Sequence, residues 1–254
     1  MKAKSVLAFM AHPDDVEFQC SGTLLRLKAL GWELHIATTT AGDGGTMEHS
    51  PEEIQRIRFE EGKAAADRMG ASYRCAAELD FLVSYEPGAI RKTVEIVRET
   101  QPSLVITHYP VDYMRDHEVT SQLVRNACFC AGAPNMKTGA VPTAPPLSGI
   151  PHLYYAAPME GRDFFGEGVT MPFYVDVTAL VDEKEALLKC HASQRDWLMK
   201  HHGIDEYLEA MRRSSAEAGQ HIGVQYAEGF RQHLGHAYPQ DNLLRELVDG
   251  VEPK

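Results

Sequence analysis

The order of apolar and polar segments predicts an α/β fold, a Rossmann-like and mostly parallel sheet with helices on both faces. Short β-branched runs alternate along the chain with longer segments that have helical spacing. This alternation is typical of sheets in which helices connect parallel strands and cover both faces. Polar segments follow three of the expected strands, and two of them, residues 12–15 and 108–117, contain both histidine and aspartate. Ligands of such folds gather at the carboxyl ends of the strands, so we expect a metal site there.

The first half of the chain contains a βαβ unit followed by a long helix. We expect strands at residues 5–11 and 33–40 and helices at residues 18–30 and 51–69. Ser50 has the character of an N-cap, because Pro51 and two glutamates follow it at the positive end of the helix dipole. Gly70 is typical of a residue that ends a helix.

The second half of the chain continues the alternation. We expect helices at residues 90–100, 118–131 and 181–197 and strands at residues 104–107, 152–157 and 173–177. Residues 132–151 are rich in Gly, Pro, Ala and Thr and have no periodicity, which predicts a long loop. That loop is either a lid over the site or a plain surface connection.

The length of the chain favours one domain. A single hydrophobic core can serve 254 residues with 44% hydrophobic content. No internal repeat and no low-complexity tract divides the sequence. We therefore expect a single domain over residues 1–254, in which residues from about 198 to 254 form a helical C-terminal extension.

Charge and composition argue against several kinds of partner. The formal net charge of −11 repels phosphate backbones, so we expect no nucleic-acid partner and a small, neutral or weakly charged ligand instead. No stretch approaches the roughly 18 consecutive apolar residues of a membrane span. The basic start and short apolar run are similar to a signal peptide, but the run ends in a polar turn and is interpreted as a core strand. Five cysteines, an odd number without zinc-knuckle spacing, favour reduced thiols and a cytoplasmic protein.

Two polar segments at strand ends have the composition of a metal site. A zinc hydrolase needs three nitrogen or oxygen ligands, an open position for water and a base beside that water. Residues 12–15 (His-Pro-Asp-Asp) can supply two ligands and the base, and Asp116-His117 can supply the third ligand. Alternatively, the first segment is a capped helix start in which an aspartate accepts backbone N–H groups. The second acid–imidazole pair favours the metal site.

Ordered motifs run along most of the chain. They are Ala11-His12-Pro13-Asp14-Asp15-Val16-Glu17 with Ser21-Gly22-Thr23, Thr39-Thr40-Ala41-Gly42-Asp43-Gly44-Gly45, Arg58-x-x-Glu61, Asp112 to His117, and Lys184 with His191-Ala192-Ser193-Gln194. Together they resemble the PIG-L/LmbE-like family of zinc-dependent N-acetylglucosaminyl deacetylases. The resemblance extends to about Trp197, and several motifs in order are more specific than any one of them.

The resemblance implies a metal centre and a base. His12, Asp15 and His117 would hold one Zn²⁺ per chain, or another divalent transition metal such as Fe²⁺. Asp14 would be the general base that takes a proton from metal-bound water and passes it to the leaving amine. Asp116 would orient an imidazole through a hydrogen bond.

The resemblance also implies substrate contacts. Arg58 would contact the sugar, and Asp43 and Arg115 are further candidate substrate-binding residues. For Arg58, a salt bridge with Glu60 or Glu61 on the same helix explains the residue equally well.

One position departs from the family pattern. Many members have a histidine three positions before the third metal ligand, where it stabilises the oxyanion that forms from the amide carbonyl. Met114 stands at that position and cannot donate a hydrogen bond. The candidate replacements are Arg115, His191, Tyr113 and His108. Of these, His191 is a candidate catalytic residue, either in its own site or in that of a neighbouring subunit.

These observations predict a zinc-dependent hydrolase that removes an N-acetyl group from an N-acetylglucosamine-type amino sugar or its conjugate. The alternatives are an amidase acting on another acylated amine and a non-catalytic relative that binds metal or sugar. The resemblance also implies a homo-oligomer.

Overall fold

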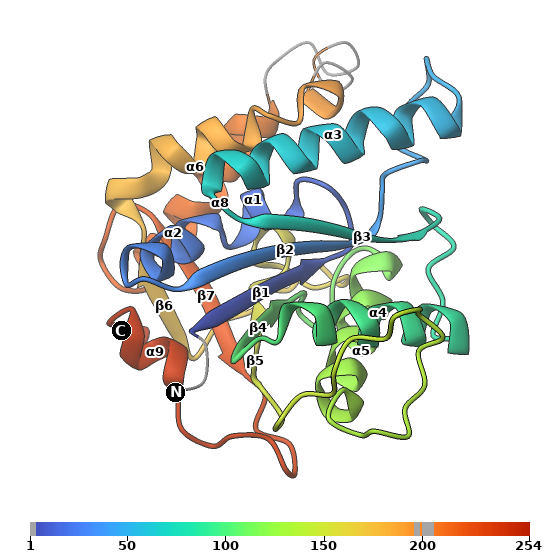
Figure 1. Cartoon of the computed structure of the whole chain (residues 1–254). Helices are drawn as coiled ribbons and strands as arrows, with labels where there is room; N and C mark the ends of the chain where they lie inside the picture. The colour runs from blue at the N-terminus through green and yellow to red at the C-terminus, as the bar shows by residue number, and fades with distance from the viewer. Residues whose placement is uncertain (1–3, 196–198, 200–205) are drawn as a thin grey trace.

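A seven-stranded sheet forms the centre of the computed structural model, which describes residues 4–195, 199 and 206–254 (Figure 1). The strands are β1 (Ser5–Met10), β2 (Glu33–Thr40), β3 (Ser72–Glu78), β4 (Leu104–Thr107), β5 (His152–Ala156), β6 (Phe173–Asp176) and β7 (Ala227–Gln232). Their order is β3-β2-β1-β4-β5-β7-β6. The first five are parallel, and β7 runs antiparallel to β5 and β6. The predicted mostly parallel α/β fold is confirmed.

Helices cover both faces of this sheet. They are α1 (Asp15–Gln19), α2 (Ser21–Ala29), α3 (Pro51–Met69), α4 (Pro87–Thr100), α5 (Arg115–Cys130), α6 (Val181–Leu188), α8 (Glu206–Gln220) and α9 (Leu243–Leu247), with short 3-10 turns η1 (Met159–Gly161) and η2 (Thr178–Leu180). Helices α3, α6 and α8 lie over one face, and α4 and α5 lie over the opposite face (Figure 1). None of the helices in the described part of the chain is long and apolar enough to cross a membrane.

Each face of the sheet has its own hydrophobic core, because side chains along a strand alternate between the faces. In β1, Val6, Ala8 and Met10 pack with residues of α1, α2 and α3. Leu7 and Phe9 of the same strand pack with residues of α4 and α5. All five side chains are fully buried. Strand β1 is therefore central in the sheet. The residues that follow its carboxyl end lie at the middle of that edge of the sheet.

The long N-terminal helix follows its sequence signals closely. Ser50 Oγ accepts the Glu53 N–H at 3.2 Å, and Gly70 ends α3 in the left-handed region at φ 73°. The segment expected to be one helix from residue 18 to 30 is two helices, α1 and α2. They separate at Cys20, whose φ of −145° lies outside the helical region.

Three later helices differ from their predicted bounds. Helices α4 and α5 each begin three residues before the predicted start, at Pro87 and Arg115. The helix expected at residues 181–197 is interrupted, because α6 ends at Leu188 and residues 192–195 are helical again. Residues 196 and 197 of that prediction lie outside the described residues.

The sequence pattern does not reveal strands β3 and β7. Strand β3 lies at the edge of the sheet and is mostly exposed or half-buried, so it has no apolar run to recognise. Strand β7 contains Gly229, where a Cβ would lie 2.8 Å from side-chain atoms of Met171 and Tyr174. The segment expected to be a helical C-terminal extension contains α8 and α9 and also β7, which is part of the sheet between β5 and β6.

Residues 132–151 form the predicted long loop. The loop is fastened to α4, because Glu95 accepts hydrogen bonds from Thr138 Oγ1 at 2.5 Å and from Ala144 N at 2.7 Å. None of its residues lines the main cavity of the described structure. These contacts favour a surface connection over a lid.

Candidate active site

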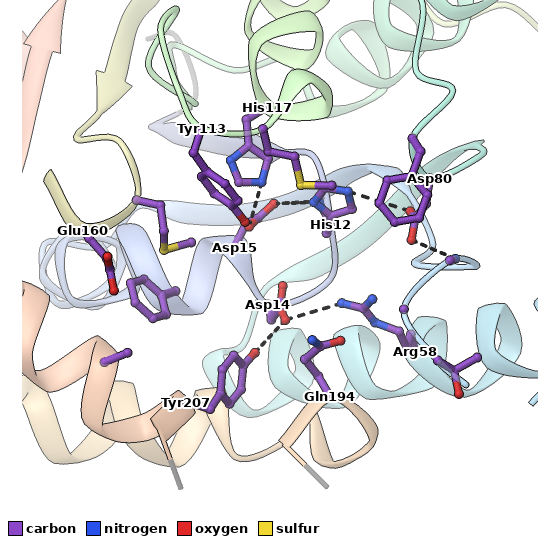
Figure 2. Close-up of a pocket in the computed structure, with 18 of the residues that line it drawn as sticks. His12, Asp14, Asp15, Arg58, Asp80, Tyr113, His117, Glu160, Gln194 and Tyr207 are labelled. Carbon is purple, nitrogen blue, oxygen red and sulfur yellow. Dashed lines mark hydrogen bonds and ion pairs between the residues drawn. The ribbon is translucent and has the colours of Figure 1, made fainter. Parts of the chain in front are cut away.

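Three loops at the carboxyl edge of the sheet meet around a cavity of about 510 Å³ (Figure 2). They follow β1, β2 and β4, which are neighbours in the sheet, and comprise residues 11–14, 41–50 and 108–114. The cavity therefore lies where the carboxyl ends of parallel strands predict a site. Its described lining also includes residues of α3, α5 and α8.

His12, Asp15 and His117 form the group at the base of this cavity. One nitrogen or oxygen atom of each lies within 4.8 Å of the others, and all three side chains are buried. His12 Nδ1 is 3.3 Å from Asp15 Oδ2, and His117 Nε2 is 3.5 Å from Asp15 Oδ1. The predicted ligand set thus comes from a loop and two helix starts after β1 and β4, about a hundred residues apart in the sequence.

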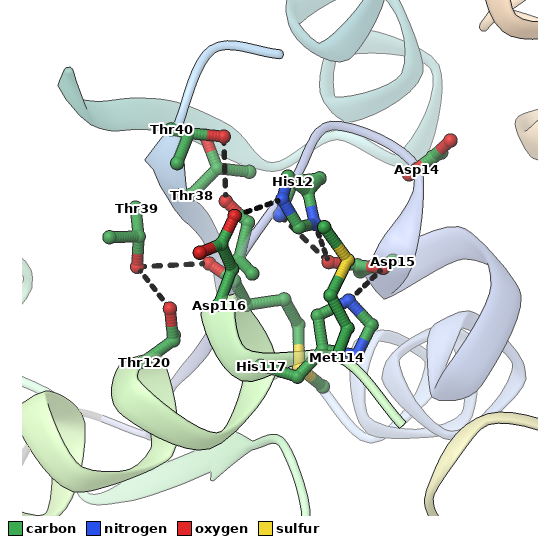
Figure 3. Close-up of polar contacts among 12 residues, drawn as sticks. His12, Asp14, Asp15, Thr38, Thr39, Thr40, Met114, Asp116, His117 and Thr120 are labelled. Atoms are coloured by element: carbon green, nitrogen blue, oxygen red, sulfur yellow. Dashed lines mark hydrogen bonds and ion pairs between the residues drawn. The ribbon is translucent and has the colours of Figure 1, made fainter. Parts of the chain in front are cut away.

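Two further carboxylates orient the imidazoles, and Figure 3 shows one of them, Asp116, beside His12. Asp112 Oδ1 lies 2.9 Å from His117 Nδ1, and Asp116 Oδ2 lies 3.3 Å from His12 Nε2. Each ring therefore has one nitrogen held by a carboxylate and the other nitrogen directed towards Asp15. Carboxylate–histidine pairs of this kind fix the tautomer and orientation of zinc ligands. The donor set fits a divalent transition metal.

The acidic surroundings also favour a cation at this place. Burial lowers the pKa of His12, but hydrogen bonds to Asp116 and Asp15 outweigh burial and raise it to about 10. The same carboxylates would stabilise a bound metal ion in place of a proton. Two overlapping groups share these histidines, namely His108-Asp112-His117 and His12-Asp80-Asp116. Only in His12-Asp15-His117 do all three members line the cavity of the described structure.

Asp14 lies beside the candidate ligands with its carboxylate in the cavity (Figure 2). Its φ of 108° is unusual for a residue with a side chain and costs on the order of 1–3 kcal/mol. Asp14 Oδ2 accepts a hydrogen bond from Tyr207 Oη at 2.6 Å and lies 3.4 Å from Arg58 Nη2. Burial raises the pKa of Asp14, while the Arg58 charge opposes that shift. This environment suits a carboxylate that exchanges protons.

Arg58 is buried behind this carboxylate and explains the glycine-rich motif. Its Nη2 donates to the carbonyl of Pro13 at 2.8 Å. A Cβ at Gly42 or Gly45 would overlap the guanidinium, so both positions need glycine to admit it. The alternative salt bridge within α3 is not formed by Glu61, which instead accepts bonds from Ser193 N at 2.8 Å and Ser193 Oγ at 2.6 Å.

Three other predicted residues do not line the cavity. Arg115 is exposed at the start of α5. Asp43 Oδ1 accepts the backbone N–H of Asp80 at 2.8 Å, so it fixes a loop of the site rather than facing the cavity. His191 is fully buried, with Nε2 3.3 Å from Glu17 Oε2. Direct contact of these three side chains with a bound substrate is not supported by this arrangement.

Of the four candidate oxyanion donors, Tyr113 alone lines the described cavity, beside Met114 (Figures 2 and 3). The Tyr113 ring meets His117 edge-on, with 5.3 Å between centroids. Tyr113 is 60% exposed, and partial desolvation together with the Asp15 charge raises the pKa of its phenol, so the hydroxyl remains a donor at neutral pH. His108 is fully buried, and its ring stacks on that of His117 with 3.9 Å between centroids. Its Nε2 accepts a hydrogen bond from the backbone N–H of Ala11. His108 therefore holds the ring of His117, a candidate metal ligand, and does not face the cavity in which a substrate would bind.

The structure adds four residues to the site that the sequence did not assign to a role: Asp80, Asp112, Gln194 and Tyr207. Asp112 and Gln194 stand in motifs, and an acid five positions before a ligand histidine is a signal that could have been used. Asp80 and Tyr207 carry no such signal, because only the folded chain brings them to the cavity.

Comparison with known proteins finds similar deacetylases and a similar hydratase. Residues 7–128 match the family model described as "PIG-L: GlcNAc-PI de-N-acetylase". A 1D-myo-inositol 2-acetamido-2-deoxy-alpha-D-glucopyranoside deacetylase of Acidothermus cellulolyticus is 23% identical over 98% of this chain and 96% of its own length. A 4-oxalmesaconate hydratase of Pseudomonas putida is 24% identical over 90% of this chain and 88% of its own.

A solved structure supports the same assignment. The N,N'-diacetylchitobiose deacetylase from Pyrococcus horikoshii superposes with a TM-score of 0.76 and 25% identity, over 95% of this chain and 89% of that chain. The fold and the matched segment, which contains all of the candidate metal ligands, agree with the sequence motifs. Residues 7–128 thus match the PIG-L model, and the chain is similar over nearly its whole length to LmbE-like deacetylases.

Proposed function

We propose that the protein is a zinc-dependent N-deacetylase that acts on an N-acetylglucosamine-type amino sugar or its conjugate. The observation that carries this proposal is the His12-Asp15-His117 group with the carboxylate of Asp14 beside it in one cavity. Three ligands with a free base nearby are what metal-assisted hydrolysis of an amide requires. Fe²⁺ is the alternative metal, because the same imidazole and carboxylate donors accept it.

The residues divide the reaction between them. His12, Asp15 and His117 would hold the metal, which when bound makes water more acidic and polarises the acyl carbonyl. Asp14 takes a proton from the attacking water and passes it to the amine nitrogen as the C–N bond breaks. The Tyr113 hydroxyl donates a hydrogen bond to the developing oxyanion. In many family members a histidine at the position of Met114 has this role. The products are a carboxylate such as acetate and the free amine.

One wall of the cavity has buried polar atoms that make no hydrogen bond among the described residues, and these atoms suit a sugar (Figure 2). Arg58 Nε, Asp80 Oδ1 and Gln194 Oε1 are buried, line the cavity and have no hydrogen-bond partner among the described residues. Buried polar atoms without partners are costly, so a ligand that bonds them gains affinity. Sugar hydroxyls can donate to the two oxygens and accept from the guanidinium. This supports a hydroxyl-rich substrate.

The charge of the cavity argues against the hydratase reading that the Pseudomonas putida relative suggests. The lining includes Asp14, Asp15, Asp80 and Glu160, whereas Arg58 is its only lysine or arginine within the described chain. Arg58 is already bonded to Pro13 and lies beside Asp14. Apart from a bound metal ion, a carboxylate-rich substrate would meet mainly like charges from Asp14, Asp80 and Glu160. A neutral acetylated sugar would not.

Metal analysis combined with substrate release tests the proposal. Purified protein is assayed for amine release from N-acetylglucosamine, from its glycosides and from acylated amines without a sugar, and for hydration of an unsaturated oxo acid. We expect chelator-sensitive release from the acetylated sugars. Faster release from amines without a sugar would indicate the amidase alternative, and hydration of the oxo acid alone would indicate a hydratase. Metal binding without any turnover would indicate a non-catalytic relative.

We also propose a cytoplasmic homo-oligomer of single-domain subunits. The free thiols of all five cysteines support a reducing compartment. Leu79, Phe81, Leu82 and Tyr85 form an exposed apolar segment beside the cavity, which is the composition of a subunit contact. Light scattering of the purified protein measures the assembly, and a monomer at micromolar concentration would contradict it.

A further inference from the structure

Tyr207 enters the site from a part of the chain that the family model does not match. It lies in the first turn of α8, whereas the match ends at residue 128. Its hydroxyl donates to Asp14 Oδ2 at 2.6 Å across 193 positions of sequence (Figure 2). The side chain of Tyr207 is largely buried, and its hydroxyl contacts the carboxylate of the candidate base.

The ring of Tyr207 is held firmly in place. It belongs to a hydrophobic cluster with Phe18, Leu188, Leu208 and Met211. Helix α8 is also tied to α6, because Arg212 bonds Asp182 at 2.6 Å and Glu185 at 2.5 Å. A hydroxyl carried on a packed ring loses little entropy when it makes its hydrogen bond.

Tyr207 and Arg58 both bond the same oxygen of Asp14. The Arg58 Nη2 distance to Oδ2 is 3.4 Å, so the tyrosine makes the shorter of the two contacts. Burial and the charge of Asp14 raise the pKa of the Tyr207 phenol well above its ordinary value, which keeps the hydroxyl protonated. Both of these contacts use Oδ2, and among the described residues no hydrogen bond is made to Oδ1 of Asp14, so that oxygen can face an attacking water.

We infer that Tyr207 is a positioning residue that pins Oδ2 of Asp14, so that Oδ1 is presented to the attacking water and to the leaving amine. The inference rests on the proposed deacetylase function. It assigns to helix α8 a part in catalysis that is exerted through the base. Because Tyr207 acts on a group whose work is done in the transition state, its loss should affect kcat rather than KM.

Tyr207→Phe tests this inference, because it removes the hydroxyl and keeps the packed ring. We expect kcat for amine release to fall about tenfold to a hundredfold, as for the loss of a hydrogen bond to a charged group, with KM and metal content unchanged. Tyr238→Phe is the matched control. Its hydroxyl makes a similar bond, to the Arg125 carbonyl at 2.6 Å, in the core on the opposite face of the sheet. The control should keep the parental kcat.

A double variant tests whether Tyr207 acts through Asp14. In the Asp14→Asn background, Tyr207→Phe should cause no further loss, because the proton acceptor is already absent. An unchanged kcat in Tyr207→Phe would overturn the inference, and so would a rise in KM alone or equal losses in both backgrounds. In those cases the parent enzyme still releases amine, so the proposed function stands. Failure of the parent enzyme to release amine would contradict both.

Discussion

The two sides of the cavity are built in different ways. The side formed by residues 12–15 and 112–117 comes from short motifs at strand ends, and each candidate ligand is oriented by a neighbour in the same motif or an adjacent loop. The opposite side comes from Gln194, which stands in a late motif, and from Tyr207 and Ala210, which reach the cavity only through packing of α8. The first side carries the chemistry, and the second shapes and positions it. Changes to the two sides should therefore differ in size and in kind.

The largest effect is expected at a metal ligand. His117→Ala removes one of three donors, so we expect the purified protein to lose most of its metal and all detectable amine release. Elemental analysis and an amine-release assay measure both. A variant that keeps full metal occupancy would show that His117 is not a ligand.

The next effect is expected at the base. Asp14→Asn keeps the shape of the side chain but removes the proton acceptor, so turnover should fall about a thousandfold while metal occupancy remains. This split between metal and turnover separates Asp14 from its neighbour Asp15. Hydrolysis at the parental rate would refute the role given to Asp14.

A smaller effect is expected at Asp112, the carboxylate that orients His117. Asp112→Asn weakens the bond that orients His117 at 2.9 Å, so metal affinity should fall about tenfold to a hundredfold. Titration with a competing chelator measures the change. Asp43→Asn, which alters a carboxylate outside the metal group, is the control and should leave metal affinity as it was.

The smallest effect is expected on the C-terminal side. Gln194→Ala removes an unpartnered acceptor from the cavity wall, so KM for an acetylated sugar should rise about threefold to tenfold, with kcat and metal content preserved. Steady-state kinetics over a range of substrate concentrations measures both constants. A loss of metal would mean that the two sides of the cavity are not as separate as the contacts indicate.

How much the sequence predicts follows the same division. Ser50, Gly70 and the apolar run of β1 predict their elements because the signals are local. The ligand group is predicted because His12 and His117 stand in motifs at strand ends. Tyr207 and β7 are not predicted, since their positions depend on packing against residues far away in the sequence. The roles expected of Arg115 and Asp43 are not supported for the related reason that a motif fixes a residue's place but not the direction of its side chain.

The most direct test of the central claim is a metal count on the purified protein, paired with amine release from N-acetylglucosamine and its glycosides before and after chelation. The account predicts about one zinc per chain and release that chelation abolishes and added zinc restores. Release that is unaffected by complete removal of metal would contradict the metal-dependent mechanism, and a metal-loaded protein that releases no amine from any acetylated sugar would contradict the proposed substrate.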